Sequence, residues 1–70
     1  MRENELEVAL QRLEDLTESN PYSVELMINK STLWYKLNNL NEAVRILGKT
    51  IEVDPFDYRV YYNLFAIYWK

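Results

Sequence analysis

A repeat of 34 residues runs through the sequence and limits the folds that the chain can adopt. The two prolines, Pro21 and Pro55, are 34 residues apart, and the same shift aligns many other identical or similar residues. The aligned pairs are Ala9 with Ala43, Leu13 with Leu47, Glu18 with Glu52, Tyr22 with Phe56, Asn29 with Asn63, Trp34 with Tyr68, Tyr35 with Trp69 and Lys36 with Lys70. This period is typical of stacked helix–turn–helix units, which bury a core only against their neighbours.

Apolar residues spaced three and four apart predict four amphipathic helices, at roughly 5–19, 24–37, 40–53 and 58–69. Pro21 and Pro55 fall between helices, because proline disfavours a helical residue before it. Connections this short make neighbouring helices antiparallel. The predicted fold class is therefore all-α, with four antiparallel helices that form a short superhelix.

Polar residues stand where the helices are expected to begin and end. The predicted N-caps are Asn4, Ser23, Asn39 and Asp57. Glu7 and Glu42 follow the first and third of these caps at the spacing of a capping box, in which side chain and backbone bond reciprocally. Asn38 predicts a tight turn before Asn39, because asparagine tolerates the left-handed conformation that ends many helices.

Several short motifs resemble the tetratricopeptide repeat, whose period is also 34 residues. Its alternation of small, large and small residues before a proline is similar to Ala43, Leu47, Thr50 and Pro55. The segments Trp34-Tyr35-Lys36, Glu52-Val53-Asp54-Pro55 and Tyr61-x2-Leu64-x3-Tyr68 match other parts of the repeat. The sequence departs from it at Lys30-Ser31, where the family has Leu-Gly, and at Phe65, where the family has a small residue. An unrelated four-helix bundle is the alternative.

The resemblance implies a single domain over residues 1–70, divided into a second-helix half (1–22), a full repeat (23–57) and a first-helix half (58–70). In this family the first helices of successive repeats line a concave groove, which binds a protein or peptide partner. The residues that this geometry assigns to the groove are Glu25, Ile28, Thr32, Tyr35, Lys36, Arg59, Tyr62, Ala66, Trp69 and Lys70. We expect an exposed row of Ile28, Tyr35, Tyr62 and Trp69 to anchor the partner. Alternatively, Tyr35 and Trp69 pack only on their neighbours.

The groove helices carry more bases than acids, because Lys30, Lys36, Arg59 and Lys70 outnumber Glu25. This charge favours an extended peptide with acidic residues. The chaperone-binding subtype of the family clamps a C-terminal carboxylate with five Lys, Asn and Arg side chains. Centring that set on Asn29 puts Asn63 where a cation is needed, and centring it on Asn63 puts Ile28 and Thr32 where Lys and Asn are needed. The clamp is therefore not predicted.

The two end helices differ in polarity. Residues 1–20 hold six of the eleven acidic residues. Arg12 and Ser19 also stand where the third helix has Ile46 and Val53, so we expect the first helix to be a solvent-exposed cap at the end of the stack. On the last helix, burial of Val60, Leu64 and Ile67 would leave Tyr61, Phe65 and Tyr68 exposed as an association face. Phe65 would obstruct a closely packed next helix. We expect a homodimer through this face, because it is the one surface that gains much by burial and twofold dimers are the commonest way to cover such a surface.

Composition excludes several classes of function. The chain has no His and no Cys, which removes the commonest acid–base group and the best nucleophile, so we expect no enzyme, cofactor or metal. Its net charge of −3 and lack of a basic stripe argue against nucleic acid. No apolar run is long enough to cross a bilayer, so a soluble cytoplasmic protein is expected. The alternatives are a purely structural homo-oligomer, a piece of a longer array without peptide binding, and a membrane-surface contact through residues 61–69.

Overall fold

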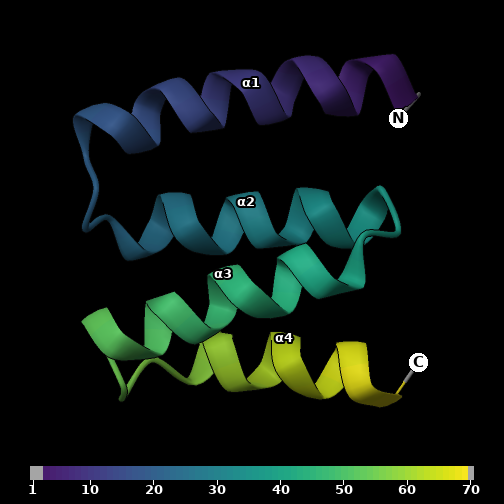
Figure 1. Cartoon of the computed structure of the whole chain (residues 1–70). Helices are drawn as coiled ribbons and strands as arrows, with labels where there is room; N and C mark the ends of the chain where they lie inside the picture. The colour runs from purple at the N-terminus through teal and green to yellow at the C-terminus, as the bar shows by residue number, and fades with distance from the viewer. Residues whose placement is uncertain (1–2, 70) are drawn as a thin grey trace.

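The computed structural model describes residues 3–69, which form four helices (Figure 1). These are α1 (Glu3–Ser19), α2 (Val24–Lys36), α3 (Leu40–Val53) and α4 (Tyr58–Trp69). Successive helices run antiparallel, so α2 and α4 point the same way and α1 and α4 lie at opposite ends of the stack (Figure 1). No strand occurs within residues 3–69, and both prolines lie in the turns between helices. The all-α prediction is confirmed.

The turns form as the sequence indicates. Ser23 Oγ accepts a hydrogen bond from the Leu26 backbone N–H at 3.3 Å and so caps α2. Asn38 adopts a φ of 65°, the left-handed conformation that ends α2. The backbone N–H groups of Asn38 and Asn39 donate to the carbonyls of Tyr35 and Trp34, which gives the helix a Schellman-type end.

The two predicted capping boxes do not form as expected. Helix α1 begins at Glu3, which places Asn4 inside the helix, where it cannot be an N-cap. Asn39 does cap α3, since its Oδ1 accepts from the Glu42 N–H at 3.2 Å. The Glu42 carboxylate, however, pairs with Arg45 one turn further on instead of returning to Asn39.

Two apolar clusters hold the helices together. Leu6 and Leu10 of α1 pack with Leu33 of α2, with Ala9, Leu13 and Leu37 around them. A second cluster joins α2, α3 and α4 and consists of Ile28, Ala43, Leu47, Val60 and Ile67. The Trp34 side chain contacts both clusters and so connects α1 to the rest of the stack. Val60 and Ile67 are buried and Leu64 packs beside them, as the sequence predicts for α4.

Candidate binding groove between α2 and α4

Two adjoining hollows lie between α2 and α4, the helices that the repeat makes equivalent. The first has a volume of about 260 Å³ and is lined by Ser31, Thr32, Tyr35, Lys36, Asn63, Ala66 and Ile67. The second has a volume of about 300 Å³ and is lined by Ile28, Thr32, Tyr58, Arg59, Tyr62 and Asn63. Because Thr32 and Asn63 line both, the hollows are two parts of one groove.

The floor of the groove is apolar and belongs to the core. Ile28 is only 8% exposed and packs in the cluster with Leu47 of α3 and Val60 of α4, so its predicted exposure is wrong. The family geometry assigned Ile28 to the groove side of α2, but residues of α3 and α4 cover it there. Burial of an isoleucine contributes about 1.5–3 kcal/mol, which favours this position. Tyr35 also packs against this cluster while it lines the first hollow.

The serine and threonine hydroxyls that line the groove are bonded within α2. Ser31 Oγ and Thr32 Oγ1 both donate to the Ile28 carbonyl, at 2.8 and 3.0 Å. The Asn63 carboxamide, by contrast, makes no hydrogen bond to any residue within 3–69, and it stands where the two hollows meet. A carboxamide has both donor and acceptor capacity, so this group remains available to a ligand.

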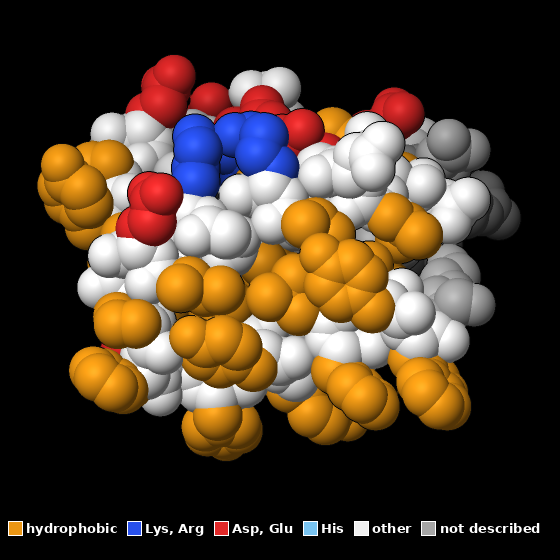
Figure 2. Space-filling model, turned by 60° about the horizontal axis from the view of Figure 1, so that its bottom comes forward, with side chains coloured by type: hydrophobic (Ala, Val, Ile, Leu, Met, Phe, Trp, Pro, Cys, Tyr) orange, Lys and Arg blue, Asp and Glu red, His pale blue; other side chains and the backbone are white. Residues whose placement is uncertain are grey.

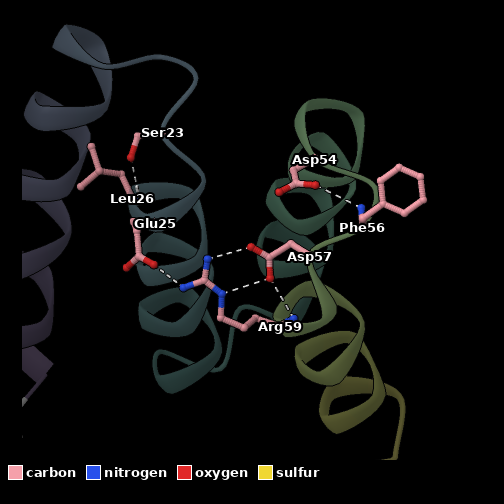
Figure 3. A network of polar contacts seen from close by, with 7 residues as sticks. All are labelled: Ser23, Glu25, Leu26, Asp54, Phe56, Asp57 and Arg59. Carbon is pink, nitrogen blue, oxygen red and sulfur yellow. Dashed lines mark hydrogen bonds and ion pairs between the residues drawn. The ribbon is translucent and has the colours of Figure 1, made fainter.

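A network of polar contacts closes the end of the groove where both helices begin (Figure 3). The Arg59 guanidinium pairs with Asp57 at 2.7 Å between Nη2 and Oδ2, and with Glu25 of α2 through Nη1. Asp57 Oδ1 also accepts from the Arg59 backbone N–H at 3.0 Å and caps α4. Hydrogen bonding to Arg59 lowers the pKa of Asp57, and hydrogen bonding to Asp57 and Glu25 raises that of Arg59. Positions 25 and 59 are 34 residues apart, so this ion pair joins equivalent positions of α2 and α4.

The charges around the groove differ from the excess of bases expected from the sequence. Arg59 is already paired with two carboxylates. The charge of Lys30 acts on Glu42 of α3 and lowers its pKa, after the larger effect of Arg45. Lys70 lies outside the described residues. Lys36 therefore remains as the one cation that lines the hollows without an ion pair inside residues 3–69.

The groove holds most, but not all, of the predicted site residues. The predicted residues that line the hollows are Ile28, Thr32, Tyr35, Lys36, Arg59, Tyr62 and Ala66, and Glu25 stands at one end. Trp69 lines neither hollow, because its ring stacks on Phe65 with centroids 5.7 Å apart and 11° between planes. Sequence reasoning missed Ser31, Tyr58, Asn63 and Ile67. Asn63 could have been found, because it follows Arg59 by one helical turn and so shares its face.

The outer face of α4 carries several exposed aromatic rings. The exposed rings on it are those of Tyr58, Tyr61, Phe65, Tyr68 and Trp69, which we call the aromatic face. At 3.6 residues per turn they lie within about 100° of one another around the helix. Figure 2 shows hydrophobic side chains over the part of the molecule where α4 lies, with charged groups gathered above them. Tyr61 is held against the preceding turn, since its hydroxyl donates to the Pro55 carbonyl at 2.8 Å.

A family model described as tetratricopeptide repeat matches residues 1–67. The chain belongs to the tetratricopeptide repeat family. This family suggests a protein-interaction module of a kind that is typically non-enzymatic. Comparisons with curated proteins and with solved structures gave no match.

Membrane insertion and metal binding are two further properties to compare with the structure of this tetratricopeptide chain. Across residues 3–69, no helix has both the length and the apolar character needed to cross a membrane. The same residues contain no group of three His, Cys, Asp or Glu side chains placed to hold a metal ion.

Proposed function

We propose that this tetratricopeptide chain is a protein-interaction module that holds a partner peptide in the groove between α2 and α4. In the same proposal, it associates with a second copy of itself through the aromatic face of α4. The two surfaces share only Tyr58, which lines the second hollow and also belongs to the aromatic face. The rest of the groove is lined by α2 and α4 together, whereas the other four rings of the aromatic face line neither hollow.

The observation that supports peptide binding is the pair of adjoining hollows with an apolar floor and a polar rim. Each hollow is no larger than the smallest pockets that bind small molecules. It therefore suits a single side chain and not a whole cofactor. Ile28 and Ile67 supply the apolar floor, while Lys36 and Asn63 supply polar groups at the edge. A few polar groups around an apolar hollow are the usual composition of a specific binding site.

The test blocks the first hollow without changing the core. Ala66 is exposed on α4 and lines this hollow, so Ala66→Arg should place a long side chain across it. Peptides selected from a random library on the wild-type chain should lose at least tenfold in affinity for this variant. Gln11→Arg, at an exposed position of α1, is the matched control and should bind like the wild type. If the selected peptides bind Ala66→Arg unchanged, the groove is not their site.

Self-association is supported by the area and the charge of the aromatic face. With about 150–250 Å² per aromatic side chain, the exposed parts of its five rings amount to roughly 700 Å² per copy. Two copies would then bury about 1,400 Å², above the ~1,000 Å² that a biological interface needs. The only charged residue of α4 is Arg59, which is paired. Two copies of α4 therefore meet without like charges, and their acidic α1 helices stay at the far ends.

Sedimentation equilibrium tests the dimer. The triple variant Tyr61→Glu, Phe65→Glu and Tyr68→Glu should be monomeric where the wild type is dimeric. The control, Val8→Glu with Leu16→Glu, adds acids to exposed apolar positions of α1 and should leave the dimer intact. A wild-type chain that is monomeric at high micromolar concentration would contradict self-association and leave the groove proposal untouched.

A further inference from the structure

We infer that the ligand of the groove is an extended peptide segment with apolar side chains at alternate positions. It also carries an acidic residue, which follows the apolar side chain that lies at the Lys36 end of the groove. This inference rests on the proposed peptide binding and names the kind of peptide. Three observations carry it, namely the spacing of the hollows, the unpaired carboxamide between them and the distribution of charge along the groove.

The spacing of the hollows matches the repeat of an extended chain. Along α4, the lining residues of the second hollow centre near position 60 and those of the first near position 65. At a rise of 1.5 Å per residue, this separation is roughly 7 Å along α4. Along α2 the lining residues centre near positions 30 and 33–34, which gives roughly 5 Å. In an extended peptide, residues i and i+2 point to the same side and are separated by about 6.6 Å. Two alternate apolar side chains can therefore occupy both hollows at once.

The position of Asn63 favours an extended ligand over a helical one. Its carboxamide stands between the hollows and has no partner within residues 3–69. The residue between the two apolar side chains of an extended ligand presents a free backbone N–H or C=O at this point. A helix uses these groups internally, so it would leave the carboxamide unmatched.

The two ends of the groove carry opposite charge. Near the start of α2 and α4, Glu25 and Asp57 outnumber Arg59, which leaves one net negative charge. At the other end, Lys36 lines the first hollow and has no ion pair within residues 3–69. An acidic residue of the ligand is attracted to the Lys36 end and repelled from the Glu25 end. This polarity fixes where the acid lies, whichever way the peptide runs.

The experiment measures affinities of short capped peptides for the whole chain by NMR titration. The probes are acetyl-Leu-Ser-Leu-Ser-Glu-amide and its reversed sequence, because the chain direction of the ligand is open. Each has a version with Gln or Lys in place of Glu and one with the two leucines adjacent. For at least one direction, the Glu probe should bind about two- to fivefold more tightly than the Gln probe, the range of an exposed ion pair. The adjacent-leucine probe should bind more weakly.

Two variants test the assignment to Lys36. Lys36→Glu should reverse the preference, so that the Lys probe binds more tightly than the Glu probe. Lys49→Glu makes the same charge change at an exposed position of α3 and should keep the wild-type preference. Equal binding of the Glu, Gln and Lys probes, an unchanged preference in Lys36→Glu, or no binding of any probe would overturn the inference.

Failure of the inference can be separated from failure of the proposed function. Probes that bind regardless of charge and leucine spacing, but lose affinity in Ala66→Arg, would overturn the inference and support the groove. Probes whose affinity is unchanged in Ala66→Arg would overturn both.

Discussion

Helices α2 and α4 occupy equivalent positions of the repeat, yet one is enclosed and the other forms an outer surface. Ser31 of α2 is 2% exposed, in a helix that packs against α1, α3 and α4. The equivalent residue of α4 is Phe65, which is 64% exposed and stacks on Trp69. A small residue thus stands where helices must approach closely, and a large one where nothing in residues 3–69 covers the helix. Close packing against neighbouring helices therefore limits the size of the side chain at this position of the repeat, and the limit is absent where the helix is uncovered.

The inner faces of the two helices remain alike. Leu33 of α2 packs on Leu6 and Leu10, and its equivalent Ile67 packs with Ala43 and Leu47. Both positions carry a large aliphatic residue because each faces the helix before it, which is α1 for Leu33 and α3 for Ile67. The repeat therefore preserves its inner face, while the outer face is free to diverge.

The largest effect is expected when the outer residue of α4 is copied into α2. Ser31→Phe puts a ring into a buried position and should lower the free energy of unfolding by at least about 1–3 kcal/mol. For a chain of this size, the midpoint of thermal unfolding should fall by roughly 5–20 °C. Circular dichroism at 222 nm measures this change. The reciprocal Phe65→Ser should shift the stability of the monomer by no more than about 0.5 kcal/mol. Equal effects of the two changes would contradict the comparison.

An intermediate effect is expected on the inner face. Val60 is fully buried, so Val60→Ala should cost about 2 kcal/mol, from two lost methylene equivalents and a residual cavity. Its equivalent Leu26 is only half-buried, and Leu26→Ala should cost less although it removes more atoms. Urea unfolding of both variants gives the comparison. A larger cost at Leu26 would show that α2 depends more on its contact with α1 than this structure indicates.

Much of this fold could be predicted from the sequence because its signals are local. The start of α2, the left-handed Asn38 and the start of α4 each depend on one or two side chains beside the backbone that they cap. The groove could not be predicted in the same way, because it depends on contacts between residues that are far apart in the sequence. Burial of Ile28 requires α3 and α4, and pairing of Arg59 requires Glu25, 34 residues away. Stacking of Trp69 on Phe65 was missed because the two were assigned to different surfaces.

The smallest effect concerns the ion pair between Asp57 and Arg59 at the start of α4. Hydrogen bonding to Arg59 lowers the pKa of Asp57 from its ordinary 3.8, so the charged form stabilises the folded state. This contribution is complete above pH about 4 and is lost as the pH falls from there through the lower pKa of the folded state. Asp57→Asn keeps an N-cap but removes the charge, and should flatten the fall of stability below pH 4.

Urea unfolding at several pH values between 2.5 and 7, chosen to be about half a unit apart, measures how steeply the free energy of unfolding changes with pH. The control is Asp15→Asn, at an exposed position of α1, which should retain the wild-type slope. If Asp57→Asn and the wild type lose stability in parallel, the pairing with Arg59 contributes nothing to folding.

The proposed function requires above all that the groove between α2 and α4 binds the partner. Backbone amide shifts in a ¹⁵N-labelled chain, titrated with a peptide selected on it, test this directly. The largest shifts are predicted in residues 28–36 of α2 and 58–67 of α4, with those of α1 nearly unchanged. Shifts that are largest in α1, or spread evenly over all four helices, would contradict the account.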